Sequence, residues 1–137
     1  MAGGACLSYR TAVPVEPGLS ARVSLVVGET DTALSLGSGD VPVLATPRLI
    51  ALCEETACLA VEGTLGVGRT SVGVRVQFDH LAPVRTGSQI VAEATLEKVE
   101  GRRLVFTVTA TDAAGLVGAG KLTRVVVLRE DFLAKAR

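Results

Sequence analysis

A glutamate, Glu54, lies at a position where a folded chain normally places an apolar residue. On a helical wheel of about 100° per residue, its close neighbours are apolar and the polar side of the wheel lies elsewhere. The apolar neighbours are Ile50, Ala57, Cys58 and Val61, and the polar side carries Arg48, Glu55 and Glu62. A carboxylate in such surroundings faces the core or a subunit interface, where its burial is costly unless another group compensates for it.

The only histidine, His80, is out of place in the same way. It follows a run in which apolar residues occupy every second position, as on the buried face of a strand. The run consists of Val72, Val74, Val76 and Phe78; His80 continues it, whereas Asp79 falls on the opposite, polar face. The histidine is therefore predicted to lie on the apolar face of a strand.

A glutamate and a histidine that share a site can orient water, transfer protons and polarise a carbonyl group. Each also has a plain structural interpretation, as the edge of an apolar stripe and as the last residue of a strand. Thr46 is a third candidate, although it is also suited to cap a helix. It precedes Glu54 by eight residues, or about 12 Å of ideal helix. The two can share a site only if Thr46 lies outside the regular helix or if one of them comes from a second subunit.

The pattern of the whole chain predicts an α+β domain, with one long helix followed by an antiparallel sheet. Thr46 as N-cap and Pro47 at the first helical position begin the helix, and Gly63 is its expected stop. The expected strands cover 72–78, 89–98, 103–111 and 116–128, joined by turns at 100–101 and 112–115. Residues 8–16 and 20–27 form shorter β-type runs, and the segment 28–42, rich in Gly, Ser, Thr and Asp, is expected to be a loop or flap. The 137 residues suffice for one domain, 1–137.

Composition argues against several classes of protein. Hydrophobic residues make up 48% of the chain but aromatic residues only 3%, so the core is lean and an oligomer interface is expected to extend it. The 14 basic and 14 acidic residues form no basic stripe, which argues against nucleic acid as a partner. No apolar run approaches the roughly 20 residues of a membrane helix, and the N-terminus does not resemble a signal peptide.

The cysteines and the single histidine argue against a metal site. Cys6, Cys53 and Cys58 follow no zinc-binding or CxxC spacing, and their odd number without an export signal fits a reducing cytoplasm. Small buried thiols are the expected role for all three. A cytoplasmic protein without metal is therefore predicted.

Three stretches of the sequence carry a likeness to a known family. They run from Val43 through Glu54 to Cys58, from Gly73 through His80 to Gly87, and from Val99 to Lys135, with the turn Glu100-Gly101-Arg102-Arg103 in the third. Together they resemble the fluoroacetyl-CoA thioesterase-like family of hot-dog-fold proteins. The likeness covers about two-thirds of the chain, and its most specific parts are this turn and the spacing of Thr46, Glu54 and His80.

The resemblance implies a long helix wrapped by an antiparallel sheet, in a homodimer with active sites at the subunit interface. It implies hydrolysis of an acyl-CoA thioester without metal or other cofactor. The family's catalytic residues fall on Thr46, Glu54 and His80; Gly73 falls on a backbone position of the acyl pocket and Arg124 on an arginine near it. Glu54 would attack the thioester carbonyl or act as base on water, His80 would donate a proton, and Thr46 with the helix-start amides would stabilise the oxyanion.

One departure from the family affects the expected substrate. The segment 28–42, which corresponds to a lid with an aromatic residue in the fluoroacetyl-specific member, is short here and has no aromatic residue. A different, broader or bulkier acyl group is therefore expected. Two other functions compete: an enoyl-CoA hydratase, disfavoured because Asp79 and His80 are adjacent and face opposite ways, and a non-catalytic acyl-CoA-binding hot-dog domain.

Overall fold

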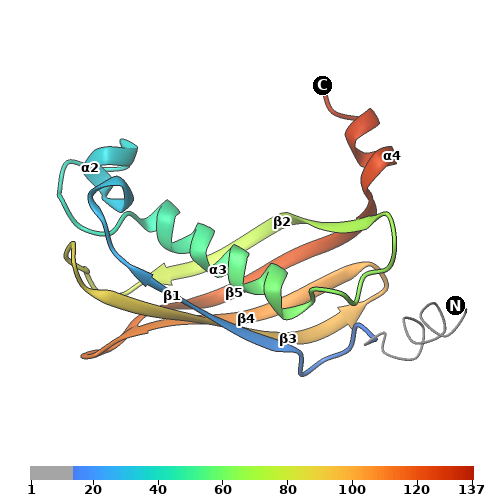
Figure 1. The fold of residues 1–137 in the computed structure, drawn as a ribbon, viewed down its shortest axis with the longest axis horizontal. Helices are drawn as coiled ribbons and strands as arrows, with labels where there is room; N and C mark the ends of the chain where they lie inside the picture. The colour runs from blue at the N-terminus through green and yellow to red at the C-terminus, as the bar shows by residue number, and fades with distance from the viewer. Residues whose placement is uncertain (1–13) are drawn as a thin grey trace, which may run out of the picture.

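One long helix and one antiparallel sheet account for most of the fold (Figure 1). The computed structural model describes residues 14–137, and in that part of the chain five strands pair in the order β1-β3-β4-β5-β2. The strands are β1 (Ser20–Val26), β2 (Arg69–His80), β3 (Gln89–Glu100), β4 (Arg103–Asp112) and β5 (Gly115–Leu128). Helix α3 (Thr46–Ala60) packs against one face of the sheet, chiefly against β1 and β3. The predicted α+β layout is confirmed, whereas the run 8–16 and Cys6 lie largely or wholly outside the described residues.

Helix α3 begins one residue earlier than predicted. Its N-cap is Ala45, which has no side-chain capping bond, and Thr46 is the first helical residue. The prediction that Thr46 caps the helix is therefore wrong, and its hydroxyl is free for another partner. The helix ends at Ala60, and Gly63 lies beyond it in a turn with a positive φ of 78°.

The core lies between α3 and the sheet and is built mainly from aliphatic side chains. Strands β3 and β4 alternate buried and exposed residues along most of their length, as expected for a sheet with one covered face. Phe106 is the largest side chain that is fully buried, and Cys53 lies in the same core. Burial, and secondarily the Glu54 carboxylate, raise the pKa of the Cys53 thiol to about 11. Cys58 is exposed, so the prediction of a buried thiol is wrong at that position.

Strand β2 contains a bulge that the sequence pattern did not predict. Gly73 pairs with Arg124 of β5 and Arg75 with Thr123, so the register shifts and Val74 is left over. A bulge of one residue reverses the alternation of side chains between the two faces. The residue numbers of Gly73 and His80 differ by an odd number, so a regular strand would place the two on opposite faces. Both face the helix because the bulge lies between them.

Strand β2 forms one edge of the sheet, and its middle is uncovered. Val74 is 52% exposed and Val76 44% exposed. The prediction of one continuous half-buried face from 72 to 78 is therefore wrong: the bulge interrupts it, and no layer formed by residues 14–137 covers its centre. An exposed apolar edge strand is a surface that proteins usually cover.

The segment between β1 and α3 is partly helical. It contains a 3₁₀ turn, η1 (Glu29–Asp31), and one turn of helix, α2 (Ala33–Leu36), so the predicted loop at 28–42 is only partly irregular. At the other end of the chain, the short helix α4 (Arg129–Ala134) extends away from the sheet where β5 ends (Figure 1).

Two glycines of β5 allow β2 to approach closely, which gives a testable prediction. A Cβ at Gly118 would lie 2.6 Å from Cζ of Phe78, and one at Gly120 would overlap the Gln77 carbonyl group. Because the obstacle at Gly120 is backbone, it cannot rotate away. We expect Gly120→Ala to lower the free energy of unfolding by about 2 kcal/mol or more, measured by urea unfolding.

Gly28→Ala serves as the matched control. Gly28 has a φ of −105°, and a Cβ there would only touch Asp31 Oδ2 at 3.5 Å. We expect its effect to stay within about 0.5 kcal/mol. Equal stabilities of the two variants would contradict the close approach of β5 to β2.

Candidate active site

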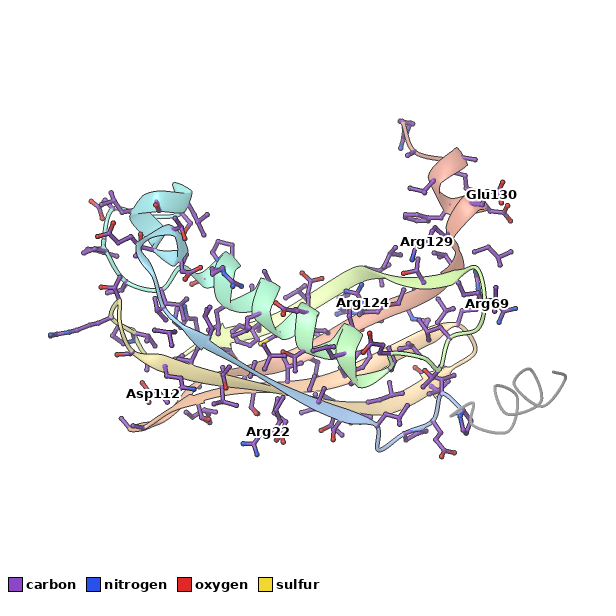
Figure 2. The ribbon with its side chains drawn as sticks, viewed as in Figure 1. Arg22, Arg69, Asp112, Arg124, Arg129 and Glu130 are labelled. Carbon is purple, nitrogen blue, oxygen red and sulfur yellow. The ribbon has the colours of Figure 1, made fainter. Side chains whose placement is uncertain are left out.

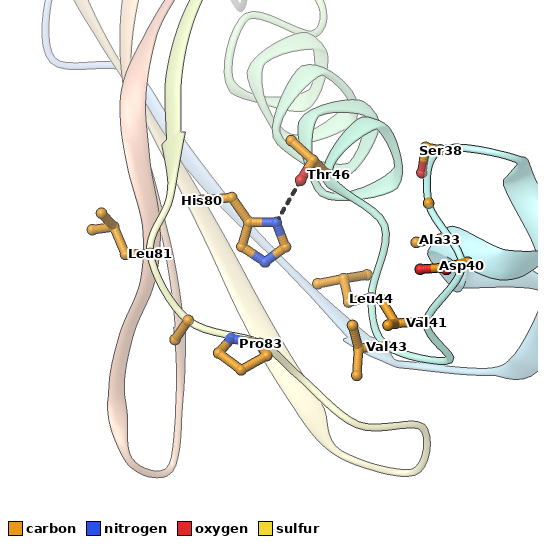
Figure 3. A pocket seen from close by; sticks show the side chains of 12 residues that line it. Ala33, Ser38, Asp40, Val41, Val43, Leu44, Thr46, His80, Leu81 and Pro83 are labelled. Carbon is orange, nitrogen blue, oxygen red and sulfur yellow. Dashed lines mark hydrogen bonds between the residues drawn. The ribbon is translucent and has the colours of Figure 1, made fainter.

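Thr46 and His80 form a hydrogen-bonded pair where the start of α3 meets the end of β2. Thr46 Oγ1 lies 2.8 Å from His80 Nδ1 (Figure 3). The other ring nitrogen, Nε2, is buried and has no hydrogen-bond partner among residues 14–137. When Thr46 donates its hydroxyl proton to Nδ1, the neutral ring carries its proton on Nε2. The pair therefore orients the imidazole and leaves Nε2 as a buried nitrogen without a partner among residues 14–137.

Glu54 belongs to a second cluster, with Arg124 of β5 and Ser71 of β2. Arg124 Nη1 donates to Glu54 Oε2 at 3.3 Å. The same guanidinium donates from Nε to Ser71 Oγ and from Nη2 to the Ser71 carbonyl oxygen, each at 2.9 Å. The Arg124 side chain is 9% exposed, whereas that of Glu54 is 38% exposed. Arg124 is thus held on three sides, and the carboxylate beside it still reaches solvent.

Gly73 lies directly beside the Glu54 carboxylate. A Cβ at this position would be 2.6 Å from Glu54 Oε2 and 3.4 Å from Arg124 Nη1. Only a residue without a side chain leaves room for the carboxylate here. Gly73 and Arg124, predicted as neighbours of an acyl pocket, therefore both contact Glu54.

Within one chain the two clusters remain apart. Thr46 and Glu54 lie on the same regular helix, eight residues or about 12 Å apart along its axis. Thr46 does not lie outside the helix, so the first of the two ways in which these residues could share a site is excluded. The structure brings Thr46 and His80 into contact, and it brings Glu54 into contact with Arg124 and Gly73, but these two groups do not meet within one subunit.

A cavity of about 350 Å³ lies next to the Thr46–His80 pair. Figure 3 shows Ala33, Ser38 and Asp40 across from His80, with Val43 and Pro83 nearby. The segment 28–42 thus supplies one wall. Asp31 attaches this segment to α3: its Oδ2 accepts from the Gly28 amide and its Oδ1 from Arg48 Nε, both at 2.8 Å.

Gly73 and Arg124 were predicted only through the family resemblance, although the sequence pattern held a signal for each, and Ser71 was not predicted. Arg124 interrupts the apolar alternation of Leu122 and Val126 on β5, the same signal that drew attention to His80. The bulge had its own signal, since a glycine inside a strand indicates a bulge or a close approach, and Gly73 shows both. Ser71 has no comparable signal, because a serine at the start of an edge strand is ordinary.

Residues 14–137 contain no group of three or more His, Cys, Asp or Glu side chains arranged to hold a metal ion. None of the helices in this region is both long and apolar enough to cross a membrane.

Comparisons with known proteins identify the family of this chain. The sequence profile of the fluoroacetyl-CoA-specific thioesterase family matches residues 27–130. A fluoroacetyl-CoA thioesterase of Streptantibioticus cattleyicolor is 35% identical over 95 residues, covering 69% of this chain and 68% of the relative. The solved structure of the fluoroacetyl-CoA thioesterase FlK superposes with a TM-score of 0.84 at 29% identity, covering 90% of this chain and 96% of that one.

A more distant structure has the same fold. A thioesterase superfamily member of Thermus thermophilus superposes with a TM-score of 0.81 at 28% identity, covering 88% of this chain and 90% of that one. The helix packed on an antiparallel sheet is therefore a hot-dog fold, and the protein is a thioesterase. The chain belongs to the fluoroacetyl-CoA-specific thioesterase family.

The contact between Gly73 and Glu54 gives a prediction about activity. In Gly73→Ala, the new methyl group would displace the carboxylate, because 2.6 Å is too short for a carbon–oxygen contact. We expect thioester hydrolysis to fall about 10-fold to 100-fold in kcat, with thermal stability nearly unchanged, because the edge strand leaves the carboxylate room to move toward solvent. Steady-state thiol release measures the rate, and unchanged kcat would show that Glu54 is not held against Gly73.

The attachment of Asp31 gives a prediction about pH. The hydrogen bond from the Gly28 amide, assisted by Arg48 and opposed by partial burial, lowers the pKa of Asp31 below its ordinary value. A lowered folded-state pKa contributes stability above the ordinary aspartate pKa of about 4, which is lost as the pH falls through the folded-state value. We therefore expect Asp31→Asn to lower the melting temperature most at neutral pH and by progressively less as the pH falls below about 4.

Asp40→Asn is the control for this measurement, because Asp40 is an exposed carboxylate of the same segment with no hydrogen bond among the described residues. It should melt with the wild type at every pH. A constant difference between Asp31→Asn and wild type from neutral to acidic pH would rule out the charge of Asp31 as the cause.

Proposed function

We propose that the protein is a cytoplasmic homodimer that hydrolyses acyl-CoA thioesters at sites shared between its subunits. In each site, Thr46 and His80 of one subunit face Glu54, Gly73 and Arg124 of the other. The observation that carries this proposal is the separation of the two clusters along one uncovered edge strand, β2. FlK, to which this chain is similar, has been crystallised as a mutant with fluoroacetate and CoA.

The edge strand supports the dimer. Val74 and Val76 are half-exposed in the single chain, and the backbone of β2 has hydrogen-bonding capacity on its outer side. A second copy of β2, pairing antiparallel, would satisfy these groups and cover the two valines. Such an interface is isologous, since the same strand serves both subunits.

The symmetry of this pairing supports a shared site. If the two-fold axis passes through Gln77, Arg75 of one subunit lies opposite Asp79 of the other, and because Val74 is left over in the bulge, Gly73 lies opposite His80. Directly opposite residues of an antiparallel pair have side chains on the same face, and both residues face the helix within their own subunit. The carboxylate of Glu54, which contacts Gly73, would then approach the partner's His80.

The chemistry follows from these positions. Water adds to the thioester carbonyl carbon, the carbon–sulfur bond breaks, and the proton lost by water reaches the leaving sulfur. Glu54 either takes that proton as base or first attacks the carbonyl itself, giving an anhydride that water opens. His80 donates from Nε2, and Thr46 holds the ring through Nδ1, while the helix-start amides at Thr46 lie near the developing oxyanion.

The acyl group is proposed to be other than fluoroacetyl. The segment 28–42, one wall of the cavity beside His80, has no aromatic side chain to close over a very small acyl group. A cavity of about 350 Å³ has room for a bulkier group. Thiol release across a panel of acyl-CoAs of increasing size identifies it.

Mixing two inactive variants tests the shared site. Glu54→Gln and His80→Ala should each lose nearly all activity, because each removes one partner from every site. After unfolding and refolding together in equal amounts, half of the dimers combine one subunit of each kind. One of their two sites then has both Glu54 and His80, so about a quarter of the wild-type activity should return.

Three results, from this experiment and from two separate measurements, would argue against the proposal. No recovery on mixing would place Glu54 and His80 in the same subunit. A monomeric mass by light scattering at micromolar concentration would exclude the dimer. Binding of acyl-CoA without turnover by the wild type would favour the alternative, a non-catalytic acyl-CoA-binding domain.

A further inference from the structure

Two arginines near the end of β5 have no acidic partner. Arg69 begins β2, and Arg102 lies in the turn between β3 and β4; both are exposed, and among the described residues neither forms an ion pair. They border the same small hollow over Val126, Val127 and Leu128. Arg102 also borders a second hollow with Lys135, where Asp131 offsets the lysine charge. Two unpaired guanidinium groups beside a hollow form a site that suits phosphate.

Arg69 also borders a larger groove on the other side. This groove has a volume of about 630 Å³ and lies between the end of α3 and the start of β2. Its lining is mostly apolar and includes Cys58, Val61, Leu65, Val67 and Ser71. Glu62 is its only acidic lining residue among those described. Figure 2 shows Arg69 and Arg129 at this end of the sheet, with Arg124 further along it and Arg22 on the opposite side of the molecule.

The groove leads toward Glu54. Cys58, in its wall, lies one helical turn after Glu54 on α3, and Ser71 holds the guanidinium that contacts Glu54. Along β2, Gly73 and Arg69 are four residues apart, or about 13 Å of strand. This separation is comparable to the length of a pantetheine arm, which is linear and carries apolar and amide groups.

We propose that Arg69 and Arg102 bind the phosphates of coenzyme A, and that the pantetheine arm lies in the groove between Arg69 and Glu54. This inference rests on the proposed hydrolysis of acyl-CoA thioesters and adds the residues that bind the coenzyme A portion of the substrate. The thioester then reaches Glu54 from the end of α3, and the acyl group points past Gly73 toward the cavity beside the partner's His80. The phosphate groups, and not the acyl group, supply the contacts with Arg69 and Arg102.

The test compares two thioesters with the same acyl group. Acyl-CoA carries a pyrophosphate and a 3′-phosphate, whereas acyl-pantetheine carries no phosphate. We expect Arg69→Ala and Arg102→Ala each to raise KM for acyl-CoA about tenfold with kcat nearly unchanged. Both variants should keep the wild-type kcat/KM for acyl-pantetheine. The KM of the wild type for acyl-CoA should rise with salt, and this dependence should weaken in the double variant.

Arg22→Ala is the matched control. Arg22 is an exposed arginine of β1 that pairs with Glu93 at 3.7 Å, away from the groove, and its removal should leave both substrates unaffected. Unchanged KM for acyl-CoA in the Arg69→Ala/Arg102→Ala variant would overturn the proposal, as would an equal loss with both thioesters. A KM effect that also appears with acyl-4′-phosphopantetheine would assign the contact to the phosphate that carrier-bound substrates share with CoA.

Calorimetric binding of CoA separates this proposal from the proposed hydrolysis. If the wild type binds CoA and the double variant does not, the phosphate site stands even when no thioester is turned over. If the wild type hydrolyses acyl-CoA through Glu54 but both proteins bind CoA equally, hydrolysis stands and the phosphate site fails.

Discussion

The pairing of β2 with β5 determines where the strand residues of the site lie. Two glycines on β5, Gly118 and Gly120, let the backbone and the Phe78 ring of β2 come close. The bulge in this strand pair lies between Gly73 and His80, and it allows both residues to face helix α3. Without the bulge, one of these residues would face away from α3, since strand side chains alternate strictly.

A single guanidinium organises the charge at the centre of this arrangement. Arg124 is nearly buried, and two of its three hydrogen bonds go to Ser71, one to the side chain and one to the main chain. The bonds to Ser71 therefore fix the Arg124 guanidinium independently of its 3.3 Å contact with the Glu54 carboxylate. Because the carboxylate is partly exposed, solvent weakens the ion pair. The contact orients the Glu54 carboxylate and leaves it partly exposed to solvent.

Much of the fold could be predicted because the periodic signals were strong. The helix from Thr46, the hairpins of β3, β4 and β5, and the placement of His80 on the helix-facing side all follow from spacing. The N-cap was assigned to Thr46 because threonine is a favoured N-cap residue and proline is favoured directly after the N-cap. In the structure Ala45 is the N-cap, and the Thr46 hydroxyl bonds to His80 instead.

The site itself was harder to predict for physical reasons. Side-chain alternation assumes an unbroken strand, so a bulge at Val74 reverses the assignment of every residue before it. Val76 lies on the helix-facing side of β2 and is nevertheless 44% exposed, which alternation alone does not predict. Cys53 and Cys58 have the same side chain, so residue type alone does not indicate which of them is exposed. Their positions on the helix decide it: Cys53 is buried and Cys58 is exposed.

That difference between the two cysteines makes α3 accessible to selective chemistry. Cys53 is buried and its thiol pKa is raised to about 11, so it reacts poorly as a nucleophile near neutral pH. Cys58 is exposed and lies one turn beyond Glu54. In a chain with Cys6 replaced by serine, a maleimide fluorophore would therefore attach to Cys58 alone, and its emission would report on whatever occupies the space beside the carboxylate.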